Sequence, residues 1–123
     1  MYQSAITIGN DPAAEALSTE QLLASLHHQS HHLRGRAAAE LSRRYHESEH
    51  IFTELLAVVV SPVDRMARVL GLTTVSWIAA IAILENGTPE QVRQVTAILN
   101  SWEATEKEDL KYYLRHTKLK LEF

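Results

Sequence analysis

Leu33-Arg34-Gly35-Arg36-Ala37 is the first of three related stretches that decide the fold predicted for this chain. The others are Pro62-Val63-Asp64-Arg65-Met66-Ala67 and Glu90-Gln91-Val92-Arg93-Gln94, so the spacing is about 30 residues. Each stretch places an aliphatic residue beside a charged one near the start of a predicted helix, and a more apolar helix follows. One such pair cannot bury its apolar face alone, which favours a stacked helical repeat.

The composition indicates one globular domain and excludes several classes of function. The chain has 123 residues, 46% of them hydrophobic, and a formal net charge of −3. This balance argues against a general nucleic-acid binder, which usually carries a basic excess. The chain has no cysteine, so disulfides, thiolate nucleophiles and cysteine-ligated metals are excluded.

The sequence shows neither a secretion signal nor a membrane span. Met1-Tyr2-Gln3-Ser4 has no basic region followed by an apolar run, as a signal peptide requires. The longest apolar stretch, Val75 to Leu84, is too short to cross a bilayer. We therefore expect a soluble cytoplasmic protein that makes no contact with a membrane.

Capping patterns mark the predicted helix boundaries. Expected N-caps are hydroxyl side chains, in three cases with a Glu or Gln that completes a capping box, and the expected stops are glycines. The expected N-caps are Ser18, Ser30, Ser48, Ser61, Thr88 and Thr105, and the expected stops are Gly71 and Gly87. They predict helices at 19–28, 31–45, 49–60, 62–71, 73–86, 89–101 and 106–116. Residues 1–17 are predicted to form an irregular arm, 18–116 the helical domain and 117–123 a tail.

The predicted helices are of two kinds. The segment 31–45 is amphipathic, with Leu33, Ala37, Ala38 and Leu41 on one stripe and its arginines mostly off it. The segments 49–60 and 75–84 are apolar on nearly every side, which indicates that they are buried or face a partner. Central residues of the most apolar helices should form the core, namely Leu55, Ile78, Ile81 and Leu99.

The alternation of helix types and the run Leu33-Arg34-x-x-Ala37-x-x-x-Leu41 resemble HEAT repeats of the armadillo-like superfamily. Val92-Arg93 repeats the aliphatic–arginine pair, whereas Asp64 stands where the family pattern has arginine. The resemblance covers residues 18–116 and implies an all-α short solenoid of about three antiparallel helical pairs. A compact helical bundle is the alternative. Small HEAT-like proteins also serve as chromophore-lyase or light-harvesting-antenna factors, a further alternative that rests on the resemblance alone.

The sharpest chemical motif is His46-Glu47-Ser48-Glu49-His50, which matches H-E-x-x-H. In zinc hydrolases a continuous helix brings both imidazoles to one face, and the Glu acts as general base. Ser48 is a predicted helix cap, so we expect a helix break between His46 and His50 and no bound metal. Zinc-dependent hydrolysis remains the enzymatic alternative.

Two other clusters of polar residues suggest binding. His27, His28, His31 and His32 include pairs four residues apart that suit a divalent metal, but Ser30 is expected to break the helix between them, which favours a pH-sensitive turn. Six arginines lie within residues 34–68: Arg34, Arg36, Arg43, Arg44, Arg65 and Arg68. They form either a phosphate-binding or acid-binding ridge or, as we favour, a solvated face paired with Glu40, Glu47, Asp64 and Glu90.

The end of the chain predicts an interface. Tyr112 and Tyr113 point in different directions on a helix, so one is expected to be buried and the other exposed. Leu119, Leu121 and Phe123 alternate with polar residues in a tail that a monomer need not bury. The tail either packs on the last helix or reaches a neighbouring chain as an extended segment. We therefore expect a non-catalytic protein-interaction module or adaptor that needs no cofactor and forms a homodimer or a stable hetero-complex.

Overall fold

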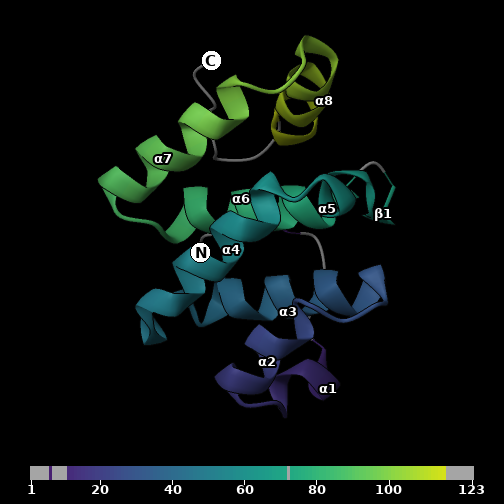
Figure 1. Ribbon diagram of the computed structural model, residues 1–123, viewed down its shortest axis with the longest axis vertical. Helices are drawn as coiled ribbons and strands as arrows, with labels where there is room; N and C mark the ends of the chain where they lie inside the picture. The colour runs from purple at the N-terminus through teal and green to yellow at the C-terminus, as the bar shows by residue number, and fades with distance from the viewer. Residues whose placement is uncertain (1–5, 7–10, 72, 116–123) are drawn as a thin grey trace.

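The computed structural model describes residue 6 and residues 11–71 and 73–115. The described chain is mostly helical, as the sequence predicts (Figure 1). Its helices are α1 (Pro12–Glu15), α2 (Thr19–Ser25), α3 (His31–Arg43), the short 3-10 helix η1 (Tyr45–Glu47), α4 (Glu49–Val60), α5 (Pro62–Met66), α6 (Val75–Asn86), α7 (Pro89–Asn100) and α8 (Ala104–Leu114). The strands β1 (Arg68–Leu70) and β2 (Thr73–Thr74) form an antiparallel hairpin.

Most predicted helix starts are confirmed because the side chains that cap them act locally. The side chains of Ser18 and Thr88 each accept a hydrogen bond from the backbone N–H of the third helical residue, Gln21 or Gln91. The side-chain oxygen of that glutamine in turn accepts from the backbone N–H of the cap residue. Ser30, Ser48 and Ser61 also cap their helices, and Gly87 ends α6. The helical turn α1 lies within the segment 1–17, and the Asp11 carboxylate caps it.

The prediction of a helix over 62–71 is wrong beyond Met66. The chain leaves α5 at Ala67 and turns back at Gly71, whose φ of 58° is the left-handed conformation that glycine adopts without strain. The backbone N–H of Val75 donates to the Ala67 carbonyl oxygen at 2.9 Å and closes the base of the hairpin. Gly71 is therefore a hairpin turn rather than a helix stop, and Thr74 caps α6 in place of the predicted start at residue 73.

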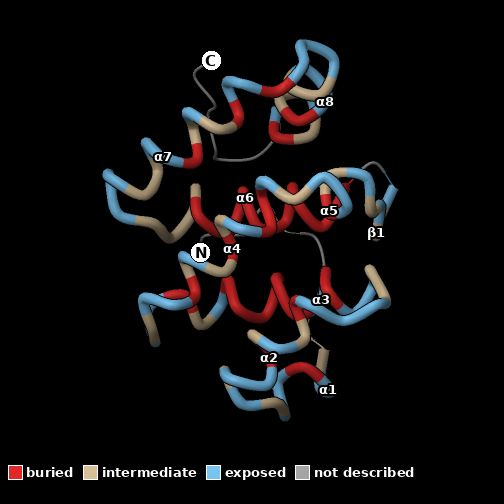
Figure 2. The backbone as a smooth tube through the Cα atoms, in the orientation of Figure 1, coloured by how far each residue is buried: buried red, intermediate tan, exposed pale blue. Residues whose placement is uncertain are grey.

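Helix α6 is the centre of the molecule. It packs against α3 and α4, and also against α5 and α7. Nine of its residues, from Val75 to Ile83, are buried, as Figure 2 shows. The four predicted core residues are confirmed: Leu55, Ile81 and Leu99 are 0% exposed and Ile78 is 1% exposed. One apolar helix thus organises the fold, and the helices around it each present an apolar stripe.

The helices are arranged in layers along the longest dimension of the molecule (Figure 1). Helices α1 and α2 lie at one end and α3 follows; α4, α5 and α6 form the middle, and α7 and α8 lie at the other end. This order brings the α5 end of the middle layer and the hairpin near α8, although the sequence separates them by the whole of α6 and α7.

Candidate functional site

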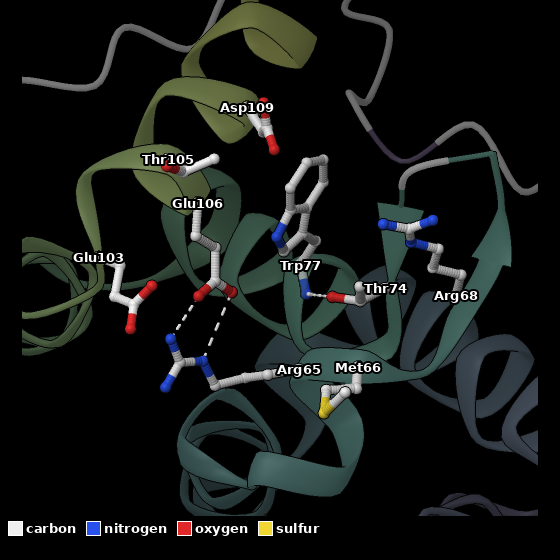
Figure 3. Close-up of a pocket in the computed structure, with 9 residues that line it drawn as sticks. All are labelled: Arg65, Met66, Arg68, Thr74, Trp77, Glu103, Thr105, Glu106 and Asp109. Atoms are coloured by element: carbon white, nitrogen blue, oxygen red, sulfur yellow. Dashed lines mark hydrogen bonds and ion pairs between the residues drawn. The ribbon is translucent and has the colours of Figure 1, made fainter.

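A pocket of about 470 Å³ lies between α8 and the segment that joins α5 to α6 through the hairpin (Figure 3). Its walls differ in charge, since α8 supplies carboxylates and the α5–hairpin segment supplies two arginines. The lining residues are Arg65, Met66, Arg68, Thr74, Trp77, Glu103, Thr105, Glu106 and Asp109. The pocket depends on the hairpin, which places Arg68 in its lining. If α5 continued to residue 71, Arg68 would lie further along that helix instead.

The acidic wall is one edge of α8. Glu103, Glu106 and Asp109 are spaced by three residues, which places their side chains in a row along a helix. The prediction that Thr105 caps this helix is wrong: α8 begins at Ala104, its N-cap is Glu103, and the Glu103 side chain makes no capping hydrogen bond. The Glu103 carboxylate therefore lies at the rim of the pocket without a partner among the described residues.

Arg65 binds this acidic edge from α5. Its guanidinium donates through Nε and Nη2 to the two carboxylate oxygens of Glu106, the fork-to-fork geometry that arginine favours. The same guanidinium lies over the ring of Trp102, with its carbon 4.8 Å from the ring centroid. The side chains of Arg65 and Glu106 are 31% and 23% exposed. This pair shows that the α8 edge and the aromatic rings beside it suit a guanidinium group.

Trp77 forms the back of the pocket and carries an unsatisfied donor. Its side chain is buried, and its ring packs on Tyr113 with the centroids 5.8 Å apart. Within the described part of the chain, its indole Nε1–H finds no hydrogen-bond acceptor. Leaving such a donor unpaired costs on the order of 1–3 kcal/mol. Figure 3 shows the indole nitrogen on the ring edge that faces Glu106, whose carboxylate is held by Arg65.

Three further charges at the pocket have no partner among the described residues. Arg68 lies on the hairpin, and Glu103 and Asp109 lie on α8; all three are exposed. Figure 3 places Arg68 on the opposite side of Trp77 from Glu103. The site therefore offers an acidic wall, the Arg68 guanidinium without a partner in the described chain, and the buried Trp77 donor between them.

The structure separates the two histidines of the H-E-x-x-H motif. His46 lies in η1, His50 lies in the first turn of α4, and Ser48 between them is extended, with φ −159° and ψ 142°. The predicted helix break is confirmed, and the continuous helix that a zinc hydrolase needs is not formed. The described residues contain no group of three His, Asp or Glu side chains arranged to hold a metal ion.

The second histidine cluster is also split. Ser30 caps α3, and its own backbone N–H donates to Nδ1 of His28 at 2.9 Å. His27 lies 3.5 Å from the Glu54 carboxylate on α4. His31 and His32 stack on each other at the start of α3. The cluster is a turn between α2 and α3, as predicted, and its pH sensitivity stays a prediction.

Most of these arginines are paired with carboxylates of the protein itself, and Arg36 lies 3.7 Å from the Asp11 carboxylate. Arg43 and Arg44 both bind Glu40 at helical spacing, as the favoured alternative predicts. Arg34 differs, because its Nε donates across 30 residues to Asp64 at 2.8 Å and the pair is buried rather than solvated. That contact pins α5 to α3, with the consequence that Arg65 and Met66 face the pocket.

The predicted interface residues lie only partly in the described chain. Tyr112 is 66% exposed, with the Arg115 guanidinium 4.4 Å from its ring centroid, whereas Tyr113 is half-buried against Trp77. The expected difference between the two tyrosines is therefore present. Leu119, Leu121 and Phe123 lie outside the described residues.

Sequence reasoning missed the pocket. Trp77 belongs to the apolar segment 75–84, which the sequence predicts to be buried; this is correct for its ring but says nothing of its N–H. A tryptophan on a helix that is apolar on all sides is itself a signal, since a buried indole usually finds an acceptor and such a helix supplies none.

The chain was compared with protein-family models, with curated proteins and with solved structures, and none of the three comparisons found a match. None of the helices in the described part of the chain has the length and hydropathy of a membrane span.

Proposed function

We propose that this protein is a non-catalytic protein-interaction module. The observation that carries the proposal is the surface formed by Val60, Val63 and Met66, here called the α5 surface. These side chains are 51%, 68% and 84% exposed. They occupy consecutive positions three residues apart at the α4–α5 junction, and Met66 also lines the pocket.

The exposure of the α5 surface contrasts with the burial of most other aliphatic side chains in the described chain. Of the five large hydrophobic side chains that are exposed in the described chain, three belong to this surface. Clustered apolar exposure beside polar groups is typical of a binding site. Methionine suits such a surface because its unbranched side chain adapts to different partners.

The layered arrangement supports the HEAT-like part of the proposal. In a solenoid each helical pair packs mainly on its neighbours, and here α4 and α6 stand between α3 and α7. The hairpin interrupts the middle unit, and it is this interruption that exposes α5.

The enzymatic alternative has no comparable support. It requires His46 and His50 on one helical face, and the extended Ser48 between them removes that geometry. The chromophore-lyase and light-harvesting alternatives rest on the resemblance to small HEAT-like proteins alone.

The test compares the full chain with a Val63→Asp/Met66→Asp variant in a pull-down and in light scattering. Both substitutions are at exposed positions and should leave the circular dichroism spectrum unchanged. We expect the native chain to form a homodimer or to retain a stable partner, and the variant to lose it, because a buried carboxylate at an interface is strongly unfavourable. Equal behaviour of the two proteins would refute the α5 surface as an interface.

A chain ending at Thr117 tests the other predicted interface, formed by the last two helices, Tyr112 or Tyr113 and the tail. Loss of association in this shortened chain, with the α5-surface variant unaffected, would move the interface to the tail. A monomer without partners in all three proteins would refute the interaction function itself.

A further inference from the structure

We propose that the pocket beside α8 binds an arginine-bearing segment of a partner protein, with the guanidinium on the acidic edge and a main-chain carbonyl on the Trp77 N–H. The inference rests on the proposed interaction function and names the chemistry of the partner. It is carried by three observations in the same place: free carboxylates, a buried donor without an acceptor and a guanidinium already bound there.

The charges of the pocket select a cation. The α8 edge carries three carboxylates, and Arg65 neutralises one of them, so Glu103 and Asp109 remain. A further carboxylate ligand would be repelled by these two groups. A cation is attracted by both, and the exposed position of both groups makes this attraction sensitive to salt.

The geometry favours guanidinium over ammonium. Arg65 shows the manner of binding, since its planar fork engages both oxygens of Glu106 and lies over the Trp102 ring. Ammonium is a point charge and gains less from a row of carboxylates beside an aromatic ring. An incoming arginine competes with Arg65 for Glu106. It meets no competing cation at Glu103 and Asp109, which have no partner among the described residues.

The buried donor requires a ligand with a hydrogen-bond acceptor as well as a cation. The indole nitrogen faces Glu106 (Figure 3), so the Arg65–Glu106 pair must swing outward before an acceptor can reach it. This pair is partly exposed and lies at the mouth of the pocket. A peptide supplies a carbonyl a short distance from each arginine side chain, whereas a polyamine supplies cations and no acceptor.

Arg68 fixes the direction of the segment. It lies on the wall opposite Glu103 and has no partner among the described residues (Figure 3). Its charge repels a second arginine on the hairpin side and attracts main-chain carbonyls or an acidic residue there. The recognised segment therefore places its arginine toward α8 and its acceptors toward the hairpin.

The experiment titrates the ¹⁵N-labelled full chain with a capped seven-residue peptide that has arginine at its centre and alanine and glycine elsewhere. The Trp77 indole N–H resonance is followed. The spectrum of Trp102→Phe assigns it, because the chain has two tryptophans and this variant keeps only Trp77. We expect a saturable downfield shift of this resonance, because it gains an acceptor. The same peptide with citrulline, which keeps the shape and removes the charge, should bind at least about tenfold more weakly.

Two variants of the pocket should change the affinity for the arginine peptide in opposite directions. Glu103→Gln/Asp109→Asn should weaken binding of the arginine peptide about tenfold or more, since both carboxylates are charge-assisted acceptors. Arg65→Ala should strengthen it, because Glu106 becomes available to the ligand. A role of these residues in folding alone would not produce opposite changes. Glu108→Gln, on α8 but outside the pocket lining, is the matched control and should leave binding unchanged.

Four results would overturn the inference: no shift of the Trp77 resonance, equal binding of the citrulline peptide, equal binding of spermidine, or unchanged binding by Glu103→Gln/Asp109→Asn. Failure here is distinguishable from failure of the proposed function. If the full chain still loses its partner through Val63→Asp/Met66→Asp, the interaction function stands and only the chemistry assigned to the pocket is wrong.

Discussion

Polar groups are paired differently in two regions of the molecule. The centre comprises α6 and the helices packed on it, and the region around the pocket, between α8 and the hairpin, is here called the corner. At the centre, Arg34 donates to the Asp64 carboxylate and to the backbone oxygens of His28 and Gln29, and the buried Ser76 hydroxyl donates to the Val59 oxygen at 2.9 Å. At the corner, the Trp77 N–H has no acceptor among the described residues. These donors of the centre are satisfied within the chain, whereas the corner leaves the Trp77 donor unpaired among the described residues.

Hydrophobic side chains also differ between the two regions, since they are buried at the centre and exposed at the corner. Helix α6 buries its isoleucines completely, while Met66, only a short hairpin away from it, is 84% exposed. Burial of apolar side chains stabilises the fold, whereas a buried donor lowers stability unless it is hydrogen-bonded. We infer that the centre provides the free energy of folding and that the corner gives up part of it for binding.

The difference in stability between centre and corner should be largest for two ion pairs, each of which includes one residue of α5. Arg34→Ala should lower the free energy of unfolding by about 3–5 kcal/mol, because the Asp64 carboxylate stays buried without a counter-ion. Arg65→Ala should cost only about 1 kcal/mol, since its pair with Glu106 is partly exposed. Urea unfolding of both variants measures the difference. Equal losses would show that the corner is as rigid a part of the core as the centre.

The second prediction compares apolar side chains. Ile78→Ala should cost about 2–5 kcal/mol, because Ile78 is 1% exposed on the central helix and its loss leaves a cavity. Met66→Ala should change the free energy of unfolding by less than about 0.5 kcal/mol, as expected for an exposed position. The two variants can be compared by the same urea titrations. A loss below about half a kcal/mol for Ile78→Ala would contradict the central place of α6.

The third prediction uses a titrating group of the centre. The Tyr45 hydroxyl donates to the Gln91 side-chain oxygen at 2.8 Å, and burial raises the pKa of Tyr45 from 10.0 to about 12. The folded state therefore holds this proton more tightly than the unfolded state. Its contribution to stability is complete below pH 10 and is lost as the pH rises from 10 towards 12.

Tyr45→Phe should lower the free energy of unfolding by about 1 kcal/mol at neutral pH, the usual value of one hydrogen bond. It should also flatten the fall in stability on the alkaline side. Thermal unfolding between neutral pH and pH 11 measures both effects. Tyr112→Phe, at an exposed position, is the control and should change neither; an unchanged alkaline slope in Tyr45→Phe would contradict the assignment.

The helices of the centre were predictable from the sequence because their signals are local. Ser48 and Thr88 cap helices whatever the rest of the chain does, and the apolar stretch that contains Ile78 and Ile81 is buried in any compact fold. The hairpin was not predictable in this way. Residues 67–71 continue a helical pattern, and the left-handed Gly71 and the bond between Val75 and Ala67 decide against it.

The pocket was out of reach for a different reason. Arg65 and Glu106 are 41 residues apart, and no spacing rule connects them. The three acids of α8 are readable as one helix edge, but the sequence does not say that Trp77 and the hairpin face them. The site is a product of tertiary packing, whereas the caps are a product of neighbouring residues.

The smallest expected effect is at the acidic edge of the pocket. Asp109→Asn should change the free energy of unfolding by less than about 0.5 kcal/mol or raise it slightly, because this carboxylate has no partner in the described chain and lies near two others of the same charge. Glu40→Gln is the matched control at the centre, since Glu40 is 5% exposed and accepts from Arg43 and Arg44. It should cost about 2 kcal/mol or more, the value of charged hydrogen bonds that become neutral. Both variants are compared by urea unfolding at low and high salt. If Asp109→Asn proves as costly as Glu40→Gln, the acidic edge serves stability, and the corner does not differ from the centre in the way proposed.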